Sequence, residues 1–164
     1  MAANTFFFWH DYETFGAVPR RDRPAQFAGI RTDAELNEIA EPVELFCQPT
    51  PDWLPDPQSC LITGITPQQA MARGVPEYQF AAAIERELAQ PGTVGAGYNS
   101  IRFDDEVTRF LFWRNLFDPM RANGRTNAGA GICSIPCAPR MRCAPTASSG
   151  PPMTKARPVS GWNI

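Results

Sequence analysis

Two carboxylates stand near the N-terminus of the chain, at the end of a run of aromatic residues. The run is FFFWHDYETFG, residues 6–16, and its acids are Asp11 and Glu13. Along a β-strand, side chains two residues apart point to the same face and lie about 7 Å apart. Carboxylate oxygens in such a pair suit Mg²⁺ or Mn²⁺. The pair indicates a candidate metal site, although such pairs also occur on ordinary solvated strand ends.

A second pair of acids begins a helix much later in the sequence. In GYNSIRFDDEVTR, residues 97–109, Asp104 and Asp105 follow a short strand. A third carboxylate delivered beside the first strand would complete a site for two metal ions about 3.5 to 4 Å apart, an arrangement that hydrolyses phosphodiesters. The alternative is that Asp104 is a plain helix cap, because acids are favoured at helix N-termini.

The elements that would position these acids follow from the hydrophobic pattern. The continuous apolar run predicts a strand over residues 5–14 that is buried on both faces. Thr66 and Pro67 are typical of the start of a short helix. The other expected elements are strands over 25–33, 42–49 and 94–99 and helices over 76–90 and 104–117. Their order predicts an α/β domain with a mixed sheet whose first three strands form an antiparallel meander.

Length and composition favour one domain with an ordinary hydrophobic core. The chain has 164 residues, of which 43% are hydrophobic. No apolar run approaches the roughly 18 residues of a membrane span, and the N-terminus lacks the pattern of a signal peptide. We therefore expect a cytoplasmic protein that makes no membrane contact.

The last part of the sequence differs in kind from the rest. Residues 1–120 hold nine Arg against all seventeen acids, a formal balance of −8, whereas residues 121–164 hold five Arg, one Lys and no acid. A Pro-rich segment with few large apolar residues cannot bury enough surface to offset the entropy of ordering it. We therefore expect residues 120–164 to be disordered. The three Cys of this segment lack a nearby His and a C-x-x-C pair, which favours free thiols over a zinc site.

Four motifs together resemble the exonuclease I family, the 3′-to-5′ single-strand DNA exonucleases of the four-acid (DEDD) superfamily. They are HDYETFG, DRPAQFAGIRTD, LITGITP and GYNSIRFDDEVTRFLFWRNLFDP, which fall within residues 6–119. The resemblance implies a ribonuclease-H-like mixed sheet with flanking helices, Mg²⁺ dependence with Mn²⁺ as the alternative, and release of nucleoside 5′-monophosphates in DNA repair. It also implies a monomer that acts on single-stranded DNA and meets single-strand-binding protein.

The resemblance assigns roles to individual residues. Asp11, Glu13 and Asp104 match the family's catalytic metal ligands, and Glu13 would also lie near the terminal nucleotide. Arg109 matches a residue that contacts the single strand, and a guanidinium there could hold a phosphate in a bidentate way. A solvated Arg on a helix flank is the alternative for Arg109. His10 belongs to the first motif, but it precedes the metal acid, so we expect it to be structural.

The family pattern ends after Asp118 and Pro119, before the motif that supplies the general-base His and a fourth acid. Codons for MRANG, GICSI and VSGWNI are compatible, in a neighbouring frame, with segments resembling the family's continuation. We therefore hypothesise that residues 1–119 are the N-terminal part of an exonuclease domain, that residues 120–164 are a frameshifted tail, and that the C-terminally incomplete chain is inactive or impaired. The alternatives are an exoribonuclease of the same superfamily or a non-catalytic module that binds single strands. The −8 balance of residues 1–120 disfavours the module, because single-strand binders use positive grooves.

Overall fold

Five strands form one mixed sheet in the computed structural model, which describes residues 5–123 and 133–135. The order across the sheet is β3-β2-β1-β4-β5, so the first strand of the chain lies at its centre. Strands β1, β2 and β3 are antiparallel neighbours, whereas β4 runs parallel to β1 and β5 runs parallel to β4. The predicted mixed sheet with its antiparallel meander is therefore confirmed. The strands are β1 (Phe6–Thr14), β2 (Pro24–Thr32), β3 (Val43–Phe46), β4 (Thr93–Tyr98) and β5 (Cys133–Ile135).

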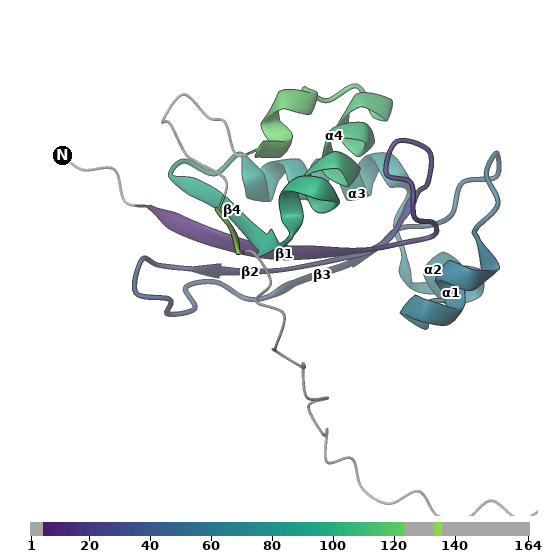
Figure 1. Cartoon of the computed structure of the whole chain (residues 1–164), viewed down its shortest axis with the longest axis horizontal. Coiled ribbons are helices and arrows are strands. Elements are labelled where there is room, and N and C mark those ends of the chain that lie inside the picture. Colours follow the sequence, from purple (N-terminus) through teal and green to yellow (C-terminus); the bar gives the residue numbers. More distant parts are fainter. Residues whose placement is uncertain (1–4, 124–132, 136–164) are drawn as a thin grey trace, which may run out of the picture.

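Two longer helices cover one face of this sheet. Helices α3 (Glu77–Leu88) and α4 (Asp104–Arg114) lie side by side above β1 and β4, whereas α1 (Pro57–Thr63) and α2 (Pro67–Arg73) lie beside the end of the sheet (Figure 1). Two short 3₁₀ helices, η1 (Ser100–Arg102) and η2 (Pro119–Asn123), flank α4 in sequence. No helix in the described part of the chain is long and apolar enough to cross a membrane.

Local sequence explains where the helices begin. The hydroxyl of Thr66 accepts a hydrogen bond from the backbone N–H of Gln69 at 3.2 Å, and the Gln69 side chain accepts one from the Thr66 N–H at 2.8 Å. This capping box, with Pro67 as the first helical residue, starts α2 as predicted. Asp56 caps α1 in the same way, through the backbone N–H of Gln58.

Strand β1 has one buried and one open face, so the prediction of a strand buried on both faces is wrong. Phe8, His10 and Tyr12 are buried beneath the helices, but on the other face Trp9 is half-buried and Asp11 is exposed. The reason is that α3 and α4 cover only one side of the sheet (Figure 1). The aromatic run therefore supplies the core with every second residue.

The core lies between β1, β2 and the two long helices. The four-residue spacing of Phe80, Ile84 and Leu88 predicts an apolar stripe along α3, and all three side chains are buried. Helix α4 adds Leu111 and Phe112, which are fully buried in the same cluster.

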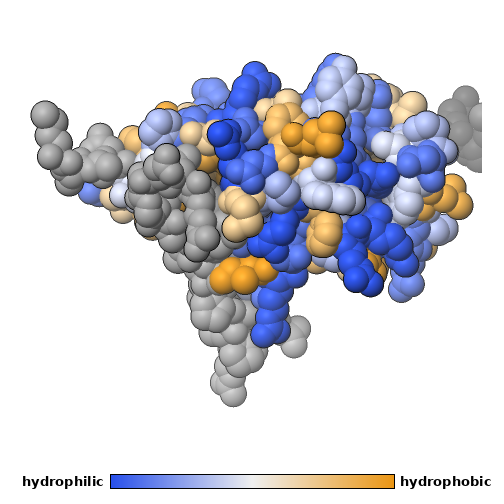
Figure 2. Space-filling view, turned by 90° about the horizontal axis from the view of Figure 1, so that it is seen from above, coloured by the Kyte–Doolittle hydropathy of each residue, from blue (hydrophilic) through white to orange (hydrophobic). Residues whose placement is uncertain are grey.

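Helix α4 needs less cover than its apolar sequence suggests. The sequence predicts apolar residues almost all round this helix, but only Trp113, which is 66% exposed, and Leu116 just beyond its end, which is 96% exposed, stand out into solvent. Figure 2 looks onto the molecule from the side of the helices and shows small orange patches separated by hydrophilic residues. Most of the apolar surface of α4 is therefore used in the core.

Two short elements fall within residues 120–164, which the sequence predicts to be disordered. Helix η2 extends to Asn123, and Cys133–Ile135 form the edge strand β5, whose register places Ser134 opposite Gly97. The rest of that prediction concerns residues 124–132 and 136–164, which lie outside the described residues.

Candidate active site

Asp104 reaches the edge of β1 at a point where the neighbouring strand has already ended its pairing. Strand β4 pairs with β1 only from Phe6 to Trp9, whose partner is Ala96. The chain then turns through Asn99, which has a left-handed backbone (φ 53°), and enters α4 at Asp104. An Oδ1 atom of Asp104 accepts a hydrogen bond from the backbone N–H of Tyr12 at 3.2 Å. The carboxylate therefore occupies the place of a strand partner between Asp11 and Glu13.

Asp104 does more than cap its helix, because its carboxylate also bonds the neighbouring strand. Phe103, the residue before it, occupies the cap position of α4, and the Asp104 carboxylate accepts a hydrogen bond from the neighbouring strand. Asp104 is the first residue of the helix and is only 2% exposed. The acid faces the strand, as a functional site requires.

Asp11 and Asp104 lie side by side next to Tyr12, with Glu13 two residues further along β1, and the charges of these acids oppose one another. Burial and the nearby charge of Asp11 raise the pKa of Asp104 to about 7. Burial also raises the pKa of Asp11, against hydrogen bonds from the Tyr12 backbone and with Asp104 that lower it. The pKa of Glu13 is raised by burial and by the charge of Asp11. A proton or a cation shared between these carboxylates would relieve their mutual repulsion.

The donor set suits a hard cation, but the described side chains do not form a finished metal site. Asp11 and Asp104 offer adjacent carboxylate oxygens, which are the ligands that Mg²⁺ and Mn²⁺ prefer. Within residues 5–123 and 133–135, however, no three His, Cys, Asp or Glu side chains are arranged to hold one ion. Glu13 therefore lies on the same face of β1 as Asp11, but its carboxylate does not converge with those of Asp11 and Asp104.

Arg109 is held by an acid of its own helix. Its guanidinium forms an ion pair with Glu106, three residues earlier, and each side chain is about a third exposed. The charge of Arg109 also lowers the pKa of Asp105, although burial raises that pKa overall. The contact of Arg109 with Glu106 was not anticipated from the sequence, and the assignment of Arg109 to the single strand stays a prediction.

His10 lies below the acids in the core. Its ring stacks on Phe27 with 5.7 Å between centroids, and it is 6% exposed. Burial lowers its pKa to about 4, so the imidazole is neutral at physiological pH. This environment agrees with the structural role expected for it and does not suit a base that faces a substrate.

Sequence reasoning missed two residues that hold Asp104 in place. The hydroxyls of Tyr12 and Thr108 are hydrogen-bonded at 2.8 Å, and Thr108 also donates to the backbone carbonyl of Asp104 at 2.8 Å. The only signal in the sequence is that Thr108 follows Asp104 by one helical turn. Nothing in the sequence indicates which strand residue its hydroxyl contacts.

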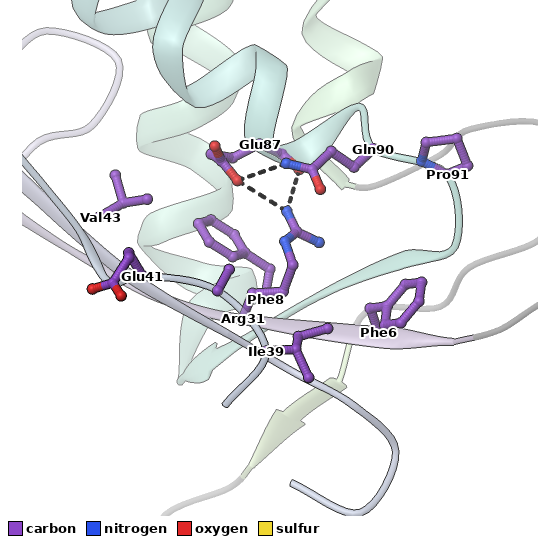
Figure 3. Close-up of a pocket in the computed structure, with 10 residues that line it drawn as sticks. Phe6, Phe8, Arg31, Ile39, Glu41, Val43, Glu87, Gln90 and Pro91 are labelled. Carbon is purple, nitrogen blue, oxygen red and sulfur yellow. Dashed lines mark hydrogen bonds and ion pairs between the residues drawn. The ribbon is translucent and has the colours of Figure 1, made fainter. Parts of the chain in front are cut away.

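The surface next to Asp11 is a shallow depression of about 300 Å³ on the open face of the sheet, and Trp9, Ile30 and Tyr98 are among its lining residues. A second cavity of about 440 Å³ lies at the opposite end of β1 (Figure 3). There Arg31 reaches the carboxylate of Glu87 at 3.1 Å above the ring of Phe8. This second cavity is far along β1 from the acids, so the depression is the better candidate for contact with a substrate.

The sheet order, with two acids on its central strand and a third at the start of α4, is typical of a ribonuclease-H-like exonuclease domain. The exonuclease family model RNase_T matches residues 8–130, and the chain belongs to this family. The resemblance to exonuclease I is confirmed over the N-terminal part, since exodeoxyribonuclease I of Escherichia coli is 58% identical over 113 residues, 69% of this chain and 24% of the relative.

Solved structures agree with that assignment. Escherichia coli exonuclease I in complex with a dT13 oligonucleotide superimposes with a TM-score of 0.75 and 50% identity, over 79% of this chain and 28% of that one. An ExoI/SSB-Ct complex gives a TM-score of 0.76 and 50% identity, over 80% and 28%. The chain therefore spans about a quarter of the length of the curated relatives that it matches.

Proposed function

We propose that this chain carries the first metal-binding half of a 3′-to-5′ exodeoxyribonuclease that degrades single-stranded DNA to nucleoside 5′-monophosphates. The observation that supports this most directly is the hydrogen bond from the Tyr12 N–H to Asp104, which sets the helix acid beside Asp11. Relatives of this family are exodeoxyribonucleases, and one neighbour binds a dT13 oligonucleotide. A role in DNA repair would follow from that activity.

The proposed cofactor is Mg²⁺, with Mn²⁺ as an alternative, since exonucleases of this family use divalent metal ions. Asp11, Glu13 and Asp104 would hold it, and Glu13 would have to approach the other two acids. When bound, the metal would activate the attacking water and neutralise charge on the phosphate. The crowded acids alone would repel the phosphodiester backbone, so DNA would bind weakly without the metal.

Two residues of this chain would orient the substrate. Glu13, half-buried on the open face of β1, would lie near the terminal nucleotide. Arg109 would hold a phosphate once its guanidinium left Glu106, because both anions compete for the same donors. Single-stranded DNA is therefore the proposed partner, together with single-strand-binding protein, by analogy with the ExoI/SSB-Ct complex.

A polypeptide of only these 164 residues should be a poor catalyst. Its one histidine is His10, which is buried and kept neutral by its surroundings, so it offers no general base at the surface. The fourth acid expected of the family is also missing from the motifs of this sequence. The proposed explanation is a shifted reading frame from about residue 120, and the DNA sequence tests it directly. A shifted frame that does not continue into a third acidic motif would disprove it.

The activity is tested by comparing three proteins on a labelled single-stranded DNA oligomer. The 164-residue chain should release little or no mononucleotide, and the longer protein read in the shifted frame should release it from the 3′ end. Asp11→Ala in that longer protein should abolish release, and wild-type activity in this variant would refute the site assignment. A matched RNA oligomer separates the exoribonuclease alternative, which requires RNA to be degraded faster than DNA.

A further inference from the structure

A closed ring of hydrogen bonds joins β1 to the first turn of α4 directly behind the acids. The Tyr12 phenol contacts the Thr108 hydroxyl at 2.8 Å, and Thr108 contacts the Asp104 carbonyl oxygen at 2.8 Å. The ring closes through the Asp104 carboxylate, which accepts from the Tyr12 backbone N–H at 3.2 Å. Tyr12 therefore contacts the Asp104 carboxylate directly, through its backbone N–H, and the Asp104 carbonyl indirectly, through the Thr108 hydroxyl.

The direction of each hydrogen bond follows from the number of protons available. A carbonyl oxygen only accepts, so the single hydroxyl proton of Thr108 goes to Asp104, and the phenol proton of Tyr12 goes to the Thr108 oxygen. A phenol keeps its proton at neutral pH, so Tyr12 can act as this donor. Thr108 is 0% exposed and Tyr12 4% exposed, so solvent does not compete for these bonds.

The ring constrains Asp104 more than packing alone would. Apolar neighbours such as Val107 and Leu111 fix α4 against the sheet but allow small rotations about its axis. Hydrogen bonds are directional, and a fully satisfied buried network specifies one arrangement. A rotation of α4 would break the two bonds that cross to β1, between the Thr108 and Tyr12 hydroxyls and from the Tyr12 N–H to the Asp104 carboxylate, whereas the bond from Thr108 to the Asp104 carbonyl lies within the helix and would move with it.

We propose that Tyr12 and Thr108 are positioning residues, and that their ring fixes the Asp104 carboxylate between Asp11 and Glu13. This inference rests on the proposed function, because it assigns the ring a role in metal binding. Residues that orient metal ligands typically change metal affinity by about 10- to 100-fold when they are replaced. We expect a similar loss here, without a matching loss of folding.

The decisive variant is the double substitution Tyr12→Phe with Thr108→Val in the 164-residue chain. It removes both hydroxyls together, so no buried polar group is left without a partner, and the urea midpoint should remain close to that of the parent. Binding of Mn²⁺ alone, followed by electron paramagnetic resonance of the free ion, should weaken about 10-fold. Thr108→Ser keeps the hydroxyl and should keep the affinity. Parental Mn²⁺ affinity in the double variant would overturn the proposal.

A metal-free measurement separates this inference from the proposed function. Hydrogen exchange of the Tyr12 amide, which donates to Asp104, should be faster in the double variant, and unchanged protection would overturn the ring on its own. Tyr12→Phe serves the same purpose if the double variant does not fold. If Asp104→Asn leaves Mn²⁺ binding of the parent intact, or if the parent binds no Mn²⁺, the proposed metal site fails, and amide exchange alone then decides the role of the ring.

Discussion

Helices α3 and α4 each begin with a buried acid, and the two acids have opposite surroundings. Glu77 opens α3, is 8% exposed, and contacts Arg23 at 3.1 Å, Arg114 at 3.3 Å and the Asn115 amide at 2.9 Å. Asp104 opens α4, is 2% exposed, and contacts one backbone N–H and a second acid. The first acid is surrounded by positive charge and the second by negative charge.

This difference distinguishes an acid that stabilises the fold from an acid that would bind a ligand. Removing a buried carboxylate that neutralises two guanidinium groups leaves uncompensated charge, so Glu77 should be required for folding. When Asp104 is ionised, the charge of Asp11 repels it, so without a proton or a cation its burial beside another acid opposes folding. Such an arrangement is typical of sites where a ligand supplies the missing charge.

The largest expected effect is on the charged cluster around Glu77. Glu77→Gln keeps the volume but leaves Arg23 and Arg114 without their shared counter-charge, and should lower the free energy of unfolding by about 3 kcal/mol. Urea denaturation measures this. The control is Glu44→Gln, which breaks the exposed pair with Arg73 and should change stability by less than about 0.5 kcal/mol. Equal effects of the two variants would contradict the scaffolding role of Glu77.

Sequence alone predicted four of the five strands of the sheet and the helices α2, α3 and α4, because these depend on short-range patterns. The Thr66 cap and the four-residue spacing of Phe80, Ile84 and Leu88 are readable within a few residues. The open face of β1 was not predictable, because continuous apolar sequence does not show which side the helices cover.

The contacts that position the site could not be predicted for a related reason. The bond from the Tyr12 N–H to Asp104 depends on where β4 stops pairing with β1, which sequence spacing does not fix. The pairing of Thr108 with Tyr12 joins residues 96 positions apart. Short motifs therefore identify the functional residues, and the tertiary arrangement decides which groups orient them.

A smaller effect should appear in the pH dependence of stability. The folded-state pKa of Asp104, about 7, lies above its ordinary value of 3.8, so the folded chain binds this proton more tightly than the unfolded chain. The resulting stabilisation is fully present below about pH 4 and is lost as the pH rises through about 7. Its slope can reach about 1.4 kcal/mol per pH unit.

Asp104→Asn tests this pH dependence and keeps an oxygen that can accept from the Tyr12 N–H. Between pH 4 and 8 the variant should lose less stability than the parent, and at pH 8 it should be the more stable of the two. Urea midpoints across this range measure the difference. Parallel curves for the two proteins would mean that Asp104 carries no unfavourable charge, and the contrast with Glu77 would then fail.

The smallest effect concerns Arg109. Its charge is neutralised by Glu106, but each of the two side chains is about a third exposed, so solvent weakens the pair. Such a pair contributes about 0.5 kcal/mol, so its release should be easy and Glu106→Gln should strengthen binding of a short oligo-dT about twofold. Fluorescence anisotropy in low salt measures this gain.

The control Glu85→Gln disrupts a separate pair with Arg121 and removes the same charge from the chain. If Glu106 acts through Arg109, the gain should vanish in the Arg109→Gln background and should exceed that of the control. An equal gain from Glu106→Gln in the parent, from Glu106→Gln in the Arg109→Gln background and from Glu85→Gln would indicate a general effect of reduced negative charge. Arg109 would then have no specific part in binding the strand.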